Sequence, residues 1–270
     1  MRRPPLPRAR SLQLEPSDDS VRPSPRASPK RASSPPPPLV DESERVKVHV
    51  RLRPLHTAGE AAVRTDASRI WVAGERDAPM QFECDRVLDA DDGQAAVYDE
   101  AARPLVSAVA AGGTACLMCY GQTGTGKTYT LGGGEAEPQR GVVDRALEQL
   151  LGDNDGDGGG LKVRMCYIEV YMELIHDLLR AESTPQLREH PESGTYVDGV
   201  AWRELRDLDH ARAEVRAAER RRHTALTQMN ASSSRSHSVL LLPVERDAAR
   251  FAAGAAGGGA VGRLYLVDLA

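Results

Sequence analysis

The segment Gly121–Thr128, with the sequence GQTGTGKT, constrains the fold of this chain more than any other feature. It matches the pattern G-x-x-x-x-G-K-[ST], in which glycines let backbone N–H groups turn inward on a phosphate. The lysine of such a loop reaches the β- and γ-phosphate oxygens, and the hydroxyl that follows it ligates Mg²⁺. The pattern predicts a nucleoside triphosphate site built from Gly121, Gln122, Thr123, Gly124, Thr125, Gly126, Lys127 and Thr128.

The residues around this phosphate-binding loop predict the strand and the helix that it requires. Thr114–Tyr120 is a short apolar run typical of a strand buried on both faces, and a helix can begin at Lys127. Alternating strands and helices indicate an α/β fold with a central, mainly parallel β-sheet and helices on both faces. Further strands are expected at 46–52, 161–171, 238–245 and 263–269, and helices at 95–110, 128–131, 143–151 and 208–225.

The first part of the chain differs in composition from the rest. Residues 1–43 hold eleven of the eighteen prolines, and residues 1–40 carry eight Arg or Lys against three Asp or Glu. A segment without aliphatic periodicity cannot offset the entropy lost on folding. We therefore expect a disordered, basic Pro/Ser-rich tail at 1–43 and one folded domain at 44–270. No apolar stretch is long enough to span a bilayer, so no membrane span is expected.

Two other patterns match metal or redox motifs only in part. Cys116 and Cys119 form a C-x-x-C pair, but a zinc site would need a second pair or nearby histidines. The four cysteines are instead expected to be reduced thiols of the core. Asp153–Gly158 matches the first half of a calcium loop, yet Arg164 stands where the bidentate glutamate is required. We therefore expect no metal at either place.

Two further segments supply groups that a triphosphate site needs. Asn230–His237 carries consecutive hydroxyls, a guanidinium and an imidazole directly before a predicted strand. Such a loop is suited to sensing the γ-phosphate and its metal. Leu264–Ala270 is an apolar strand that ends in the carboxylate of Asp268, as expected where an aspartate holds Mg²⁺ through water. Together the three segments indicate a nucleoside triphosphatase.

In this order, the three segments resemble the kinesin motor domain, and the likeness runs from about Arg45 to Ala270. In that family the phosphate-binding loop reads much like Tyr120–Thr130, the first switch reads N-x-x-S-S-R-S-H, and the second begins D-L-A. The resemblance implies a P-loop NTPase fold, ATP and Mg²⁺ as cofactors, and a motor that moves on microtubules. It further implies a location in the cytoplasm on the microtubule cytoskeleton, with tubulin and not nucleic acid as the partner.

The resemblance also implies catalytic roles. Thr128 and Ser234 would complete the Mg²⁺ shell, and Asp268 would support the metal through water. Ser233 would help to place the attacking water or the γ-phosphate. Arg235 would pair with a glutamate of the second switch that lies beyond the end of the chain.

On the base side, the resemblance implies that Arg51, Pro54 and Tyr129 flank the adenine. The chain departs from the family pattern at Met172, Asp144 and Ala218–Glu219, where Asn, Pro and Gly-Asn are usual. None of these departures removes a phosphate or metal ligand.

The chain stops at Ala270, just before the Gly-Ser-Glu that completes the second switch in the family. We therefore expect a motor domain incomplete at its C-terminus, from a fragment or an incomplete gene model, with any homodimer formed through the missing C-terminal regions. The alternative is a nucleotide-binding or microtubule-binding kinesin-related protein without motor activity. A further alternative is an interaction module whose basic tail binds acidic tubulin tails or a proline-recognising domain.

Overall fold

The computed structural model describes residues 45–54, 63–73, 79–134, 136–152, 161–191, 194–228, 235–246 and 261–270. The chain divides into two compact units, Met1–Arg45 and Val46–Ala270. The predicted tail at 1–43 and the calcium-like segment Asp153–Gly158 lie outside the described residues.

Within the described residues, the second unit contains thirteen strands, five α-helices and one π-helical turn. The strands are β1 His49–Arg51, β2 Val63–Thr65, β3 Arg69–Val72, β4 Met80–Glu83, β5 Arg86–Leu88, β6 Thr114–Cys119, β7 Leu161–Tyr171, β8 Leu174–Asp177, β9 Gln186–His190, β10 Gly194–Asp198, β11 Arg203–Leu205, β12 Ser236–Arg246 and β13 Val261–Asp268. The helices are α1 Gln94–Val97, the π-helical turn η1 Tyr98–Ala102, α2 Arg103–Ala110, α3 Lys127–Leu131, α4 Val142–Leu151 and α5 Leu208–Gln228.

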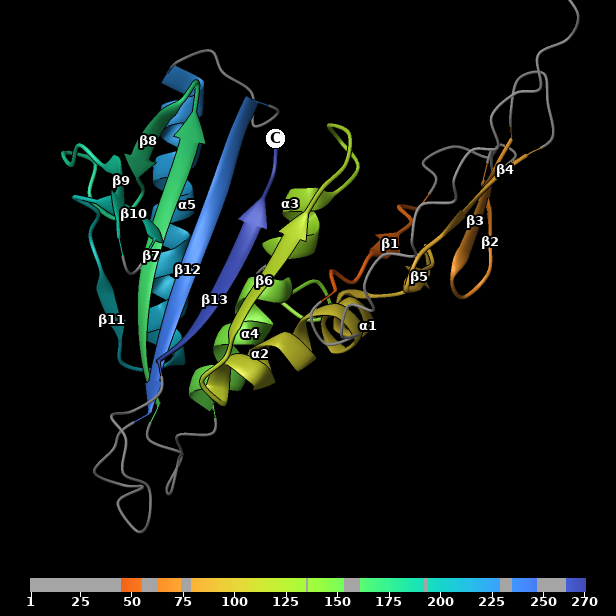
Figure 1. Cartoon of the computed structure of the whole chain (residues 1–270), viewed down its shortest axis with the longest axis horizontal. Helices are drawn as coiled ribbons and strands as arrows, with labels where there is room; N and C mark the ends of the chain where they lie inside the picture. The colour runs from red at the N-terminus through yellow and green to blue at the C-terminus, as the bar shows by residue number, and fades with distance from the viewer. Residues whose placement is uncertain are drawn as a thin grey trace, which may run out of the picture. The chain divides into compact units, whose positions relative to one another are not determined.

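The central sheet has six strands in the order β11-β7-β12-β13-β6, with β8 paired to β7 (Figure 1). Only β13 and β6 run parallel, while the other pairings of this sheet are antiparallel. The α/β class is confirmed, but the expectation of a mainly parallel sheet is wrong, because the pairing is mixed. A parallel neighbour requires a crossover of about a dozen residues or more, usually a helix, whereas β7 and β8 are joined directly by a tight turn.

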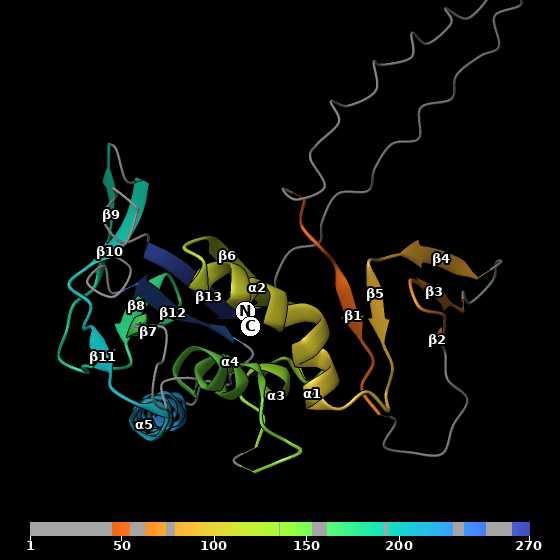
Figure 2. The same ribbon diagram turned by 90° about the horizontal axis from the view of Figure 1, so that it is seen from below.

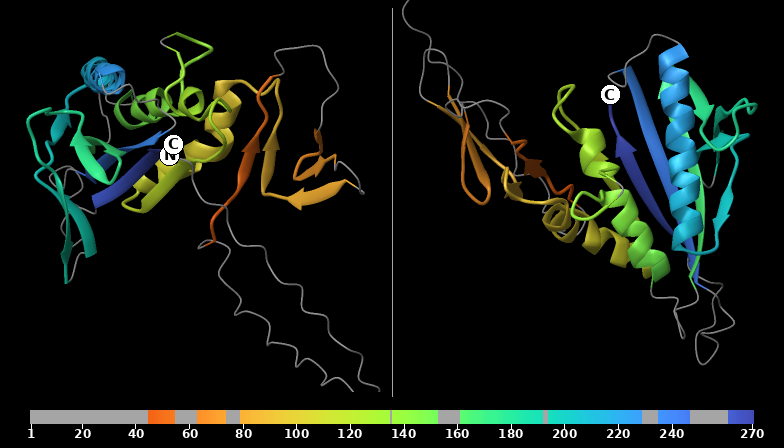
Figure 3. Two further views of the ribbon diagram at one scale, coloured as in Figure 1. Left: turned by 90° about the horizontal axis from the view of Figure 1, so that it is seen from above. Right: turned by 180° about the vertical axis from the view of Figure 1, so that it is seen from behind.

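The described helices pack on one face of this sheet (Figure 2, Figure 3). The prediction of helices on both faces is therefore met on one face only within the described residues. Alternate residues of each strand point to this face because side chains in a strand have a period of two. The core joins Val163, Met165, Leu240, Leu242, Leu264 and Leu266 of the strands to Val106, Val109, Ala146, Leu147, Leu150, Ala211 and Ala218 of the helices.

Strand β6 differs from its prediction in burial. Its residues alternate between exposed and half-buried, and Met118 is 56% exposed. The described helices cover one face of the sheet only, so the other face of β6 lacks the cover expected of a strand buried on both faces. Cys116 is likewise exposed, whereas Cys166 is buried. The expectation that all four cysteines are core thiols is therefore wrong for Cys116.

An ion-pair cluster joins α4 to α5 at one of the departures from the family pattern. Asp144 accepts hydrogen bonds from Arg212 Nε at 2.6 Å and from Arg140 NH1 at 2.9 Å. Burial alone would raise the pKa of Asp144, but the two guanidinium groups outweigh it and the pKa is lowered. The carboxylate at this position thus fastens the two helices to each other.

The turn between β7 and β8 carries a second departure. Tyr171 pairs with Leu174, so Met172 and Glu173 alone form the turn, and both have positive φ, 48° and 64°. Two-residue hairpins favour this left-handed geometry at both positions, and Asn tolerates it better than Met because its short polar side chain can bond locally. The chain therefore places Met172, for which this conformation is unfavourable, where the family often has Asn.

Replacing Met172 by asparagine is expected to raise the free energy of unfolding by about 0.5–1 kcal/mol, since the left-handed conformation costs Asn less. Urea denaturation monitored by circular dichroism measures this change. Met80 provides the control because it is also exposed, 57% against 73% for Met172, but lies in strand β4, where asparagine is disfavoured. A stabilisation of the same size from Met80→Asn would contradict the explanation from turn geometry.

Candidate nucleotide-binding site

The phosphate-binding loop lies between β6 and α3, as its sequence predicts. Gly124 and Gly126 have φ of 82° and 102°, a left-handed region that residues with a Cβ rarely adopt. Lys127 Nζ donates hydrogen bonds to Gly121 O at 2.7 Å and to Gln122 O at 3.2 Å. The loop therefore folds around the ammonium group that the motif assigns to a phosphate.

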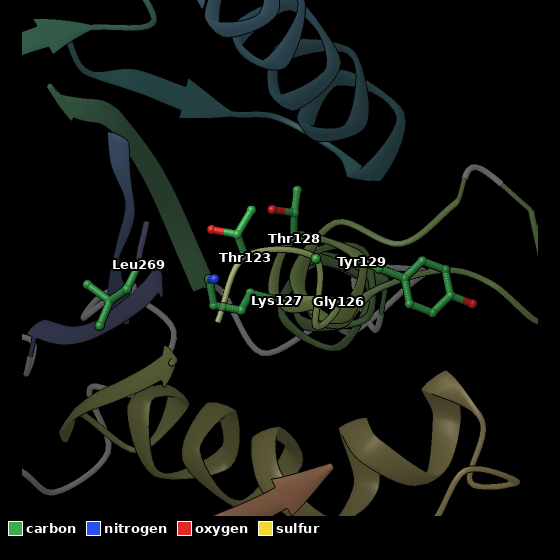
Figure 4. A pocket seen from close by; sticks show the side chains of 7 residues that line it. Thr123, Gly126, Lys127, Thr128, Tyr129 and Leu269 are labelled. Carbon is green, nitrogen blue, oxygen red and sulfur yellow. The ribbon is translucent and has the colours of Figure 1, made fainter. Parts of the chain in front are cut away.

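A pocket opens directly over this loop (Figure 4). Its lining consists of Thr123, Gly124, Gly126, Lys127, Thr128, Tyr129 and Leu269. Figure 4 shows Tyr129 and Leu269 on opposite sides of the loop, with Lys127 and Thr128 between them. The motif predicts all of these residues except Tyr129, which the family resemblance placed beside the base, and Leu269, which was not predicted. The segment after β13 brings Leu269 here, and Leu269 N donates to Cys119 O at 3.2 Å.

Thr128 and Asp268, which are 140 residues apart, meet beside the pocket. Thr128 Oγ1 donates to Asp268 Oδ2 at 2.7 Å. The contact follows from the parallel pairing of β6 with β13, which sets Asp268 opposite Cys119 at the same edge of the sheet. The structure thus joins two of the three segments that the sequence analysis singled out.

A buried guanidinium lies behind this pair. Arg222 of α5 has a side chain 5% exposed, with Nε 3.2 Å from Glu169 Oε1 and NH1 3.5 Å from Asp268 Oδ2. Burial alone would lower the pKa of Arg222, but the attraction of Tyr167, Glu219, Asp268 and Glu169 outweighs it and the pKa is raised. Arg222 therefore stays charged and ties α5 to the carboxylate of the site.

Sequence reasoning missed Arg222 and Glu169. A local signal for Arg222 did exist, because Ala211, Ala218 and Arg222 fall on one helical face and the two alanines are fully buried. An arginine on the buried face of a helix needs a carboxylate partner from another element. No sequence pattern identified Glu169 as that partner.

The residues present fit Mg²⁺ and a triphosphate. Within the described residues, Asp268 Oδ1, Arg222 NH2 and Ser236 Oγ are buried without a hydrogen-bond partner. Buried polar groups are normally satisfied, so these atoms indicate polar occupants such as water or a ligand. Carboxylate, hydroxyl and water oxygens are the donors that Mg²⁺ takes, and Thr128 and Asp268 supply two of them.

The predicted base-side residues come together in part. The Arg51 guanidinium carbon lies 5.5 Å from the centroid of the Tyr129 ring, which is 48% exposed. Burial lowers the pKa of Arg51, although Tyr129 partly offsets this effect. Pro54 is exposed and follows β1 by a short segment, in which Arg53 NH1 donates to Gly124 O. Strand β1 is thus connected to the phosphate-binding loop.

The first-switch residues Ser233 and Ser234 lie outside the described residues, and their predicted roles stay predictions. Arg235 is described, exposed, and directly precedes β12. His237 of the same segment accepts a hydrogen bond from Ala270 N at Nδ1, at 3.0 Å. The end of the first-switch segment therefore contacts the residues that follow Asp268.

Both thiols of the C-x-x-C pair have a raised pKa. Burial raises the pKa of Cys116, and it raises that of Cys119 to about 12 with a further contribution from Asp268. A reactive cysteine needs a lowered pKa, because the thiolate is the nucleophile and the ligand. Within the described residues no three His, Cys, Asp or Glu side chains gather as metal ligands.

The described part of the chain also holds no helix of the length and hydrophobicity needed to cross a membrane.

Comparison with known proteins identifies the family. Residues 41–270 match the model of the kinesin motor domain. Kinesin-like protein KIF3C of Pongo abelii is 35% identical over 254 residues, which cover 84% of this chain and 30% of that protein. Kinesin-like protein KIN-UC of Arabidopsis thaliana is 38% identical over 169 residues, which cover 61% of this chain and 16% of that protein.

A solved structure supports the same conclusion at the level of the fold. It is described as that of a fast kinesin, with implications for the ATPase mechanism and for interactions with microtubules. It matches with a TM-score of 0.76 and 30% identity, covering 84% of this chain and 66% of that one. This chain thus spans less than a third of the length of the curated relatives above. It belongs to the kinesin motor domain family, whose members are microtubule motors.

Proposed function

We propose that this protein binds Mg·ATP and couples its hydrolysis to force on microtubules, in the cytoplasm on the microtubule cytoskeleton. The observation that carries the proposal is the hydrogen bond of 2.7 Å from Thr128 to Asp268. It joins the end of the phosphate-binding loop to the start of the second switch in a chain of the kinesin family. A nucleotide bound at this junction can therefore affect both segments.

In this proposal, separate residues of the chain bind the phosphates, hold the metal and position the reacting groups. Lys127 and the backbone N–H groups of the phosphate-binding loop bind the phosphates, and Thr128 and Ser234 hold Mg²⁺, with Asp268 acting through water. When bound there, Mg²⁺ would supply positive charge to offset the negative charge of the phosphate oxygens. Ser233 helps to place the attacking water or the γ-phosphate, and Arg235 pairs with a glutamate of the second switch. Catalysis of this kind is positioning and charge neutralisation.

Arg51, Pro54 and Tyr129 bind the base in this proposal. The support for the first and third is the stacking of the Arg51 guanidinium against the Tyr129 ring at 5.5 Å. A cation over an aromatic face stiffens both side chains and leaves a flat surface that suits a purine. Because Tyr129 lies two residues after Lys127, residues of one short helix, α3, contact both the base and the phosphates in this proposal.

Microtubules are expected to change the affinity of the protein for Mg·ADP by about 5–150-fold. The reason is thermodynamic linkage. If bound nucleotide changes the affinity of the protein for microtubules, bound microtubules must change its affinity for nucleotide by the same factor. Titration of a fluorescent ADP analogue with and without polymerised tubulin measures the change, and phosphate release is followed in parallel. Actin filaments serve as the control because they are acidic polymers without tubulin.

An unchanged ADP affinity despite co-sedimentation with microtubules would contradict coupling. It would favour the alternative of a microtubule-binding, kinesin-related protein without motor activity. Absence of nucleotide binding by folded protein would refute the proposal itself.

A further inference from the structure

A buried glutamine lies at the start of α1, in a part of the chain where the sequence predicts no site residue. Gln94 is 3% exposed, and its amide makes hydrogen bonds in three directions. Oε1 accepts from Arg51 NH1 at 2.7 Å. Nε2 donates to Tyr129 O at 2.7 Å and to Gln139 O at 3.3 Å. Both amide protons and the carbonyl oxygen are therefore used.

Gln94 fixes the Arg51 guanidinium in place. The same NH1 also donates to Thr130 Oγ1 at 2.8 Å, and Thr130 Oγ1 donates to Gly126 O at 3.0 Å. Among the described residues, Arg51 makes its side-chain hydrogen bonds through NH1 alone. The guanidinium carbon lies over the Tyr129 ring, 5.5 Å from its centroid. A guanidinium anchored at one nitrogen keeps its planar face and its other donors for a further partner.

Gln94 also holds the backbone on the other side of the base. Its bond to Tyr129 O fixes the helical residue that carries the ring, and its bond to Gln139 O reaches the loop between α3 and α4. Only a neutral amide can satisfy this set, because a carboxylate would turn a second oxygen toward two carbonyl oxygens. One side chain therefore orients both partners of the stacked pair.

We propose that Gln94 is the positioning residue of the base site, which acts through Arg51 and Tyr129 and does not touch the phosphates. This inference rests on the proposed function, in which these two residues bind the base. Its consequence is selective, since loss of Gln94 must weaken binding of the base and leave binding of the phosphates intact.

The test compares Mg·ADP with Mg·tripolyphosphate, which lacks the base and the ribose, by calorimetry on the full chain. Gln94→Met removes all three hydrogen bonds at similar volume. It is expected to lower the affinity for Mg·ADP about tenfold and to change that for Mg·tripolyphosphate less than about twofold. Gln149→Met is the matched control, because Gln149 also bonds through both ends of its amide, to Tyr98 and to Ser107.

A double-mutant cycle separates positioning from a general loss of structure. Because Gln94 acts in part through Arg51, Gln94→Met is expected to cost less affinity in the Arg51→Ala background than in the wild-type chain, where the hydrogen bond to Arg51 is still present to be lost. Equal losses for the two ligands, a loss as large in Gln149→Met, or full additivity in the cycle would overturn the inference. Should Gln94→Met not fold, Gln94→Glu replaces it with the same expected selective loss.

The outcomes also distinguish the inference from the proposed function. A wild-type chain that is folded but binds neither ligand refutes both. A wild-type chain that binds Mg·ADP, with a selective loss in Arg51→Ala but none in Gln94→Met, refutes the role of Gln94 alone.

Discussion

Replacing Lys127 by alanine is expected to lower the affinity for Mg·ATP by about 100-fold or more and to abolish ATP hydrolysis. The ammonium group lies in the phosphate-binding loop, where its Nζ is 2.7 Å from Gly121 O. At an effective dielectric constant of about 20, one unit charge about 4 Å from another contributes about 4 kcal/mol. Even after the cost of removing water, enough remains for a hundredfold effect on binding a triphosphate.

Calorimetry with Mg·ATP and a phosphate-release assay on microtubules measure this effect. Lys162→Ala is the control, since Lys162 is an exposed residue of β7. We expect Lys162→Ala to leave nucleotide affinity unchanged within about twofold, because exposed charges are largely screened. Hydrolysis at the wild-type rate by folded Lys127→Ala protein would show that the role assigned to Lys127 is wrong.

The elements that surround the site could be predicted because their sequence periods are strong. β7 was expected at 161–171 and spans Leu161–Tyr171, and the helix expected at 143–151 is α4, Val142–Leu151. Both have apolar residues at the spacing of a buried face, which a sequence displays directly. The helix expected at 95–110 is a single run of α1, η1 and α2, in which the π-helical turn keeps the direction of the chain.

The short strands could not be predicted, because nothing within them distinguishes a strand from a loop. β4 and β9 are only four and five residues long and are exposed at every position, and the apolar–polar alternation of Met80–Glu83 is too short to identify a strand by itself. Their conformation comes from pairing with β3 and β10. Such pairing energy belongs to two segments together and does not appear in either alone.

Site residues could be predicted where they belong to a sequence motif, as Thr128 and Asp268 do although they are 140 residues apart. Lys127 and Thr128 belong to one local motif, whereas Gln94, Glu169 and Arg222 act on the site from α1, β7 and α5. Their roles depend on long-range contacts that the fold creates. The pairing directions of the sheet also depend on long-range contacts, because they decide which strand ends meet at the pocket.

Replacing Arg222 by alanine is expected to lower the free energy of unfolding by about 3–5 kcal/mol, the largest stability effect we expect in this chain. The substitution leaves Glu169 and Asp268, whose side chains are 3% and 6% exposed, as buried carboxylates without their cation. Uncompensated buried charge is costly because water can no longer solvate it. Urea denaturation of the nucleotide-free protein at neutral pH measures the loss.

Two comparisons decide whether burial causes this effect. Arg220 lies on the same helix but is exposed, so Arg220→Ala is expected to cost less than about 1 kcal/mol. The loss in Arg222→Ala is also expected to be the same in about 0.1 M and about 1 M salt, because mobile ions do not screen a pair that they cannot reach. A loss that disappears at high salt, or one matched by Arg220→Ala, would contradict the buried pair. A loss that persists at high salt would instead show that the ion pair between Arg222 and Asp268 stabilises the packing of α5. Because Asp268 also accepts a hydrogen bond from Thr128, the same residue would then serve both stability and nucleotide binding.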